Sequence, residues 1–154
     1  MTLILMRHAE AVHEAPDVSR RLSTHGRSEA RKAARRMKSH GIVPDLILVT
    51  TAERTRETGY IIRDTISPEA PVHSDASLYA GGEMDYLLCV SRIPESYETV
   101  LLVGHNPSIS SVATMFAGYA ITFDPAEAVY CRPVIETWAE LALSGTDRME
   151  VLRL

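Results

Sequence analysis

The sequence lacks the features that mark an exported, disulfide-stabilised or membrane-spanning protein. It has two cysteines, Cys89 and Cys131, which are too few and too far apart for a disulfide framework or a CxxC metal site. It contains no apolar run long enough to cross a bilayer, and Arg7, His8 and Glu10 interrupt the first apolar run before it could act as a leader. We therefore expect a cytoplasmic protein in a reducing environment, with no membrane association.

The chain also lacks an excess of positive charge. It carries 16 Lys and Arg against 20 Asp and Glu, for a formal net charge of -4, so no surplus of cations is available to neutralise nucleic-acid phosphates. The six histidines show no HxxxH or HxH spacing, which makes a zinc or iron site the least favoured alternative. We expect no nucleic-acid partner, no metal and no cofactor.

What the sequence does contain is the pattern of one ordinary globular domain. Its 154 residues are 45% hydrophobic and 23% charged, with no internal repeat or linker, so residues 1–154 are expected to form a single domain. Short β-rich runs alternate with amphipathic helical patterns, which predicts an α/β three-layer sandwich with a mostly parallel central sheet and helices on both faces. Residues 134–143 and 149–154, around a polar turn at 144–147, predict a C-terminal hairpin that adds an antiparallel edge.

Three apolar runs are each followed by a short polar turn that carries Arg or His. Residues 2–6 lead into Arg7 and His8, residues 46–49 lead toward Arg54, and residues 100–103 lead into Gly104 and His105. The carboxyl ends of parallel strands meet at one edge of a sheet, where ligands of α/β proteins commonly bind. We therefore expect Arg7, His8, Arg54 and His105 to converge there.

Helical geometry separates the two arginines after the second run. If Thr51 is the N-cap, Arg54 lies on the inward stripe of the following helix, whereas Arg56 points away. A buried charge is costly unless something negative meets it, so Arg54 is the functional candidate. The alternative is that Arg54 reaches water or pairs with a carboxylate such as Glu10.

Capping signals place two further helices. Thr24 as a cap and Gly41 as a stop bound one helix, and its basic outer face fits either an ordinary solvated surface, which we favour, or a guide for an anionic partner. Asn106 as a cap, followed by Pro107, opens the other, which places His105 between strand and helix. Forked arginine donors and helix N-termini both suit phosphate oxygens, so the pocket is expected to prefer a phosphoryl dianion.

These residues carry a family resemblance. Arg7-His8-Ala9 resembles the Arg-His-Gly signature of the histidine phosphatase superfamily, also called phosphoglycerate mutase-like, with Ala in place of Gly. Residues 50–58 resemble the family's Ser-Pro-x-x-Arg-x-x-Gln-Thr segment, with Arg54 and Thr58 kept, and residues 103–107 match its second histidine motif. The chain is most similar to small SixA-type phosphohistidine phosphatases. The resemblance implies a nucleophilic His8, with Arg7, Arg54 and His105 as the phosphate-binding residues and no metal.

The proton donor is where the chain departs from larger family members, which use a carboxylic acid. Glu83 is the first candidate and Asp85 the second, although both equally fit acids that stabilise a helix N-terminus. An alkoxide leaving group needs such an acid, whereas the basic nitrogen of a phosphoramidate leaves with less help. A weak or missing acid therefore favours hydrolysis of phosphohistidine in a protein.

Other functions and one segment are left open by the sequence. The alternatives are a small-molecule phosphomonoesterase, a mutase-like phosphotransferase and a non-catalytic phosphate-binding module. The partner is accordingly a phosphorylated protein or a small phosphorylated substrate, and no feature predicts an oligomeric state. Residues 118–133 either rim the pocket or, as we favour, pack the edge of the sheet.

Overall fold

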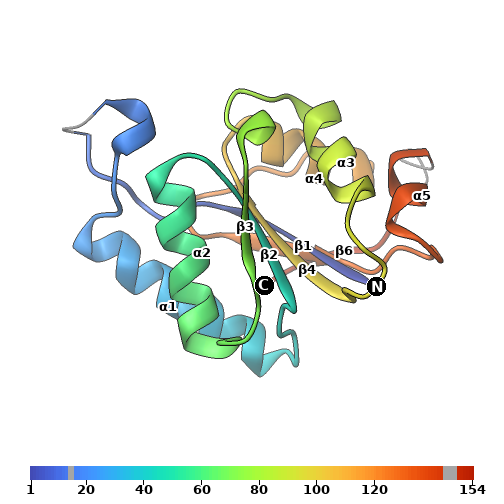
Figure 1. The fold of residues 1–154 in the computed structure, drawn as a ribbon, viewed down its shortest axis with the longest axis horizontal. Coiled ribbons are helices and arrows are strands. Elements are labelled where there is room, and N and C mark those ends of the chain that lie inside the picture. Colours follow the sequence, from blue (N-terminus) through green and yellow to red (C-terminus); the bar gives the residue numbers. More distant parts are fainter. Residues whose placement is uncertain (14–15, 144–148) are drawn as a thin grey trace.

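The computed structural model describes residues 1–13, 16–143 and 149–154 and shows a six-stranded sheet between two layers of helices (Figure 1). The strands lie in the order β3-β2-β4-β1-β5-β6. They are β1 (Thr2–Arg7), β2 (Leu46–Thr50), β3 (Val72–Asp75), β4 (Thr99–Gly104), β5 (Ala128–Cys131) and β6 (Val151–Arg153). The helices are α1 (Thr24–Ser39), α2 (Glu53–Ile66), α3 (Glu83–Ser91), α4 (Ser108–Ala117) and α5 (Trp138–Leu143), with short 3-10 turns η1 (Asp17–Ser19) and η2 (Ala76–Leu78).

The central strands are parallel and are covered by helices on both faces, as crossover connections between parallel strands require. Strands β1, β2 and β4 are almost wholly apolar and buried, as expected for strands enclosed between helical layers. Parallel pairing of β1 with β4 sets Arg7 opposite Gly104, and parallel pairing of β2 with β4 sets Val49 opposite Val103. The three strands therefore end at the same edge of the sheet.

Helices cover the two faces of the sheet in two groups. Helices α1 and α2 lie on one face, while α3, α4 and α5 lie on the other (Figure 1). Successive residues of a strand point to opposite faces, so Leu3 and Leu5 join the core under α3 and α4, whereas Ile4 and Met6 join the core under α1 and α2. The predicted three-layer sandwich with a mostly parallel sheet is confirmed.

The antiparallel edge is present, but the predicted C-terminal hairpin is wrong. Strand β5 pairs antiparallel with β1 and with β6, whereas the later part of residues 134–143 forms α5. The amide of Thr137 donates to Glu140 Oε1 at 2.9 Å, which is one half of a capping box, and the side chain of Trp138 is fully buried. A Thr-x-x-Glu signal before an apolar face was therefore available in the sequence. The predicted turn at 144–147 lies outside the described residues.

Each predicted helix exists, although its cap is displaced by one residue. The N-cap of α1 is Ser23 rather than Thr24, because the Ser23 hydroxyl accepts from the amide of Gly26 at 2.9 Å. Helix α2 is preceded by Ala52 rather than Thr51, and α4 by Pro107 rather than Asn106. The Asn106 side chain makes other hydrogen bonds: its Oδ1 accepts from the hydroxyl of Ser110 at 2.7 Å and its Nδ2 donates to the carbonyl of Phe123 at 3.0 Å.

Residues 118–133 complete the sheet and also support its functional edge. Ile121, Phe123 and Val129 are buried in the core, and β5 lies next to β1, which agrees with the favoured packing role. The same segment touches the candidate site through its main chain, since the amide of Ala126 donates to the carbonyl of His8 at 3.2 Å. Among the described helices, none has the length and apolar character needed to cross a membrane.

Candidate active site

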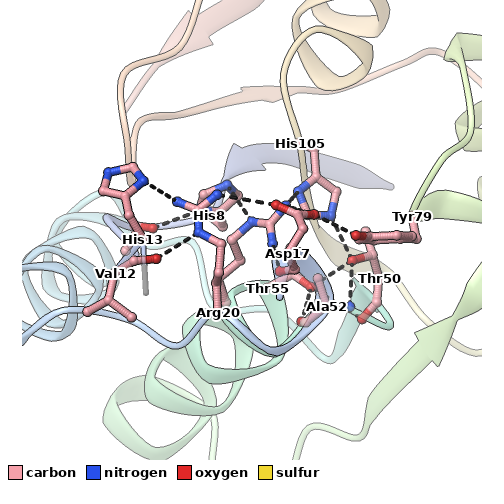
Figure 2. A network of polar contacts seen from close by, with 12 residues as sticks. His8, Val12, His13, Asp17, Arg20, Thr50, Ala52, Thr55, Tyr79 and His105 are labelled. Carbon is pink, nitrogen blue, oxygen red and sulfur yellow. Dashed lines mark hydrogen bonds and ion pairs between the residues drawn. The ribbon is translucent and has the colours of Figure 1, made fainter. Parts of the chain in front are cut away.

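The polar residues at the carboxyl ends of three parallel strands meet at one edge of the sheet (Figure 2). His8 directly follows β1, Thr50 ends β2, and His105 directly follows β4. The imidazole rings of His8 and His105 lie edge to face, with centroids 5.4 Å apart. Arg54 reaches the same point from the first turn of α2. The structure thus brings together three of the four residues expected to converge, in direct contact.

Hydrogen bonds fix both the position and the tautomer of His8. Its amide donates to the carbonyl of Gly104 at 3.1 Å, which ties the end of β1 to the end of β4. Its ring Nδ1 lies 2.7 Å from the carbonyl oxygen of Ala9. A carbonyl only accepts, so Nδ1 carries the proton and Nε2 presents its lone pair. That lone pair accepts from Nε of Arg54 at 3.2 Å.

The surroundings of His8 keep its ring neutral. Burial lowers the pKa of His8 from its usual 6.5 to about 4, and the positive charges of Arg54 and Arg7 add to the effect, against a raising contribution from the Ala9 hydrogen bond. The imidazole is therefore uncharged at neutral pH, and its Nε2 is unprotonated and accepts the hydrogen bond from Arg54.

A chain of hydroxyls fixes the tautomer of His105. Its Nδ1 accepts from Nη2 of Arg54 at 3.2 Å, so the proton must sit on Nε2, which donates to Thr50 Oγ1 at 2.8 Å. Thr50 in turn contacts the Thr55 hydroxyl at 2.9 Å, and Thr55 donates to the carbonyl of Ala52 at 2.8 Å. Burial, followed by the charge of Arg54, lowers the pKa of His105 to about 3. Both histidines thus turn unprotonated nitrogens toward the same guanidinium.

Arg54 is buried, as its place on the inward stripe of α2 predicts. Only 6% of the residue is exposed, whereas Arg56 faces outward and pairs with Glu53 at 2.9 Å. The negative partner of Arg54 is Asp17, not Glu10. Nη2 of Arg54 lies 3.2 Å from the carboxylate of Asp17, and Nη1 donates to its main-chain oxygen at 2.7 Å. The carboxylate of Glu10 instead accepts from the hydroxyl of Ser23.

Arg7 lies next to His8 in sequence, but its side chain is held by the segment before β5 rather than by α2. Its Nη1 donates to the carbonyl of Phe123 at 3.0 Å, while its Nε is buried and has no hydrogen-bond partner among the described residues. A buried donor without a partner is costly, so an acceptor supplied by a ligand would be stabilised there. The positive charge of Arg7 already acts on His8, whose pKa it lowers.

Asp17 is the residue of this site that sequence reasoning missed. Its carboxylate accepts from the Tyr79 hydroxyl at 2.5 Å, from Arg54, and from Arg20 at 3.3 Å. The Tyr79 hydrogen bond, followed by the charge of Arg54 and the bonds to the two arginines, lowers the pKa of Asp17 to about 2. Asp17 sits in a short 3-10 turn with no periodicity or motif, so no local pattern marks it.

The two acids considered as proton donors lie at the start of α3. The carboxylate of Asp85 accepts from the amide of Gly82 at 2.9 Å and so stabilises the N-terminus of α3, which is the alternative role expected from the sequence. Glu83 is exposed, and within the described ranges no hydrogen bond or ion pair joins it to His8, Arg54 or any other side chain. The carboxylate in contact with the candidate site is that of Asp17.

The chemistry of this arrangement is that of an anion site with a neutral nucleophile. Two arginines surround two neutral imidazoles, and the His8 nitrogen that faces Arg54 is unprotonated. Over residues 1–13, 16–143 and 149–154, no group of three His, Cys, Asp or Glu side chains is arranged to hold a metal ion. A phosphoryl group fits the charge and the donors available, because guanidinium forks match its oxygens.

Comparisons with known proteins agree with the sequence resemblance. The family model for the histidine phosphatase superfamily, branch 1, matches residues 3–87, which is more than half of the chain. A chloroplastic protein of Arabidopsis thaliana is 33% identical over 93% of this chain and 72% of its own length. The match to the family model includes His8 and Arg54 but ends before the second histidine motif at His105.

Solved structures with the same fold include two described as candidate SixA phosphohistidine phosphatases. The one from Nakamurella multipartitia superimposes with a TM-score of 0.80 at 28% identity, covering 99% of this chain and 94% of its own. The one from Agrobacterium tumefaciens gives a TM-score of 0.78 at 26% identity, over 87% and 95% of the two chains. The protein therefore belongs to the histidine phosphatase superfamily and has the fold of its SixA-type members.

Proposed function

We propose that residues 1–154 form one catalytic domain that hydrolyses phosphohistidine in a protein through a covalent phosphohistidine on His8. The observation that carries this proposal is the state of His8. Its Nδ1 proton is donated to Ala9, which leaves Nε2 unprotonated, with an electron pair that attacks once the hydrogen bond from Nε of Arg54 passes to the phosphoryl group. Phosphoryl transfer asks a protein mainly for in-line positioning and charge stabilisation, and the site offers both without a cofactor.

In the first step, Nε2 of His8 attacks the phosphorus atom of the substrate. A P–N bond to Nε2 forms while the P–N bond to the substrate imidazole breaks. Arg7, Arg54 and His105 are the proposed phosphate-binding residues, and the unpaired Nε of Arg7 is a donor ready for one phosphoryl oxygen. His105 gives its Nε2 proton to Thr50, so its Nδ1 must take up a proton before it can donate to the phosphoryl group. In this step the site supplies fixed cations to the negative charge of the phosphoryl group.

In the second step, water attacks the phosphorus atom of phospho-His8. The P–Nε2 bond breaks, and His8 leaves as a neutral imidazole because Nδ1 keeps its proton on the Ala9 carbonyl. The two protons of the water remain on the phosphate that is released. No external acid is needed at either step when the substrate leaving group is itself a protonated imidazole.

The preference for a phosphoramidate rests on the acids near the site. Asp85 is used as a helix cap, and the low pKa of Asp17 keeps its carboxylate ionised, so neither is a ready proton donor. Glu83 stays our candidate donor for oxygen leaving groups. A general acid contributes about 10²–10⁴-fold, so substrates with poor oxygen leaving groups should react slowly by comparison. A small phosphomonoester is the alternative substrate class.

Parallel assays on two substrates test the proposed function. Wild type, His8→Ala and a control His25→Ala variant are offered a phosphohistidine-bearing protein and an aryl phosphate in the presence of a chelator. His25 suits as control because its ring is exposed on α1, paired with Glu29 and away from the site. We expect wild type and His25→Ala to release phosphate from the protein, and His8→Ala to release none.

Other outcomes would assign other functions. Turnover of the aryl phosphate alone would identify a small-molecule phosphatase. Transfer of the phosphoryl group to a second hydroxyl of the substrate rather than to water would identify a mutase. If neither substrate is turned over but phosphate still binds, the protein is a non-catalytic phosphate-binding module.

A further inference from the structure

We propose that Asp17 is a specificity-determining residue, whose carboxylate accepts a hydrogen bond from the protonated ring nitrogen of a phosphoimidazole and so selects phosphoramidates over phosphate esters. This inference rests on the proposed function, since it names the group that recognises the leaving side of the same substrate. The evidence is the way Asp17 is held, where it lies, and its charge.

Asp17 is held on one edge of the Arg54 guanidinium, while the two histidines occupy another. The group is planar, so its Nε and Nη2 protons form one fork and its Nη1 and Nη2 protons form a second. The first fork faces Nε2 of His8 and Nδ1 of His105, both at 3.2 Å. The second faces the main-chain oxygen and carboxylate of Asp17, at 2.7 and 3.2 Å. A phosphoryl group can therefore approach the histidine edge without displacing Asp17.

Two further donors keep the carboxylate of Asp17 in place. The hydroxyl of Tyr79 donates to Oδ2, and Nη1 of Arg20 donates to Oδ1. Arg20 is itself anchored, since its Nε donates to the carbonyl of Val12 at 2.7 Å and its Nη2 lies 3.3 Å from the ring of His13 (Figure 2). So many contacts around an exposed acid indicate a group that the fold positions.

Asp17 also lies on the open side of the site. Its side chain is 54% exposed, whereas that of Arg54 beneath it is 8% exposed. In-line displacement sends the leaving group away from Nε2 of His8, and solvent is the only exit for a leaving group that is part of another protein. The departing imidazole therefore passes the end of the site where Asp17 stands.

The charge of Asp17 suits recognition of a proton rather than its donation. The hydroxyl of Tyr79 and the guanidinium groups of Arg54 and Arg20 bond to this carboxylate and hold its pKa at about 2, and the ring of His105 packs against that of Tyr79. An ionised carboxylate accepts hydrogen bonds and stabilises a nearby positive charge. A phosphoimidazole protonated on its free nitrogen carries both a donor and that charge. When its P–N bond breaks, the bonding pair returns to the ring, which leaves as neutral imidazole, so the proton needs no further transfer.

A phosphate ester offers neither feature to Asp17. Its leaving oxygen has no attached proton, and an ionised carboxylate nearby repels the negative charge that develops on it. Asp17 should therefore help nitrogen leaving groups and leave an aryl phosphate, whose oxygen departs readily without a proton, largely unaffected. This difference between substrates is the quantity to measure.

The test compares Asp17→Asn with wild type on a phosphohistidine-bearing protein and on p-nitrophenyl phosphate. One hydrogen bond to a charged group changes rates by about 10- to 100-fold, so we expect Asp17→Asn to lose about that factor on phosphohistidine and less than about 3-fold on the aryl phosphate. Tyr79→Phe, which removes one donor to the carboxylate, should also lower turnover of phosphohistidine relative to the aryl phosphate, but by a smaller factor. Asp64→Asn, an exposed acid beside Arg63, serves as the matched control.

A pH profile separates recognition from mere support of Arg54. Turnover of phosphohistidine should fall at high pH as the substrate ring loses its proton, and Asp17→Asn should move that fall to lower pH, because the favourable charge is gone. The aryl phosphate should show no such displacement. A variant that only disturbed Arg54 would lower turnover of both substrates together, with no shift of the profile.

Three results would overturn the proposal. Equal losses on both substrates would mean that Asp17 only positions Arg54. Faster turnover of both, with tighter binding of inorganic phosphate, would mean that Asp17 competes with the substrate for Arg54. If wild type hydrolyses the aryl phosphate but not phosphohistidine, both the proposed function and the role of Asp17 are refuted. If wild type hydrolyses phosphohistidine and Asp17→Asn leaves the ratio of the two activities unchanged, only the role of Asp17 is refuted.

Discussion

Acid should destabilise this protein through His8 in a way that can be isolated by mutation. The pKa of His8 is about 4 in the folded protein against 6.5 for an ordinary histidine. Between those values the unfolded chain binds a proton that the folded chain does not, so the free energy of unfolding falls as pH falls through this window. The stabilisation is complete above pH 6.5 and is lost by about pH 4.

The magnitude follows from the width of the window. Each pH unit below 6.5 costs about 1.4 kcal/mol while the folded ring stays neutral. At pH 5 the ring is still mostly neutral in the folded protein, so His8 should destabilise the wild type by about 2 kcal/mol relative to pH 7. The buried ring of His105 contributes in the same direction in both proteins compared below, so the difference between them reports chiefly the His8 ring and, to a smaller extent, its effect on the pKa of His105.

Urea denaturation at pH 7 and pH 5, at constant ionic strength, measures this loss. The wild type should lose about 2 kcal/mol more between the two pH values than His8→Ala does. His25→Ala, which removes an exposed ring, should behave like the wild type. If wild type and His8→Ala lose the same free energy of unfolding, the pKa of His8 is not lowered by its burial, and the argument that the folded ring stays neutral below pH 6.5 is refuted.

Three further substitutions, two of them with a matched control, test other parts of the structure. Arg54→Gln should lower kcat/KM by about 10²–10³-fold, as for other lost charge-stabilising donors, whereas Arg56→Gln should stay within about 2-fold of wild type because its ion pair is exposed; steady-state kinetics on either substrate decides. Thr50→Val leaves the Nε2 proton of His105 without an acceptor and should lower the free energy of unfolding by about 1–3 kcal/mol. An unchanged free energy of unfolding would show that this hydrogen bond does not stabilise the fold. Gly26→Ala should cost about 1–3 kcal/mol or more, because its Cβ would lie 2.0 Å from a main-chain oxygen, whereas Gly82→Ala meets no atom within 4 Å and should melt near the wild-type temperature.

Local pattern was sufficient for the three central strands, for α1, α2 and α4, and for most of the converging residues. Runs of apolar residues ending in Arg or His predicted that strand ends would carry His8 and His105. The 3.6-residue period separated Arg54 from Arg56 before any contact was known. The prediction for residues 134–143 was wrong because a short apolar segment fits either a strand or a helix, and here the capping pair Thr137 and Glu140 selects the helix.

Asp17 shows why the rest of the site could not be read from the sequence. It is separated from Arg54 by 37 positions and from Tyr79 by 62, and no periodicity links the three. Arg54 needed a negative partner by physical argument, and several carboxylates along the chain were available for it. Only the path of η1 across the end of the sheet selects Asp17 over Glu10.

The sequence by itself determined the α/β layers, the family and the edge of the sheet where the histidines gather, because hydrophobic periodicity and short motifs are local properties. The tertiary structure decided which nitrogen of each histidine is free, which carboxylate meets Arg54, and that residues 128–131 lie beside β1. Those features depend on hydrogen bonds between residues far apart in the chain. Their geometry exists only after the sheet and its two helical layers have packed.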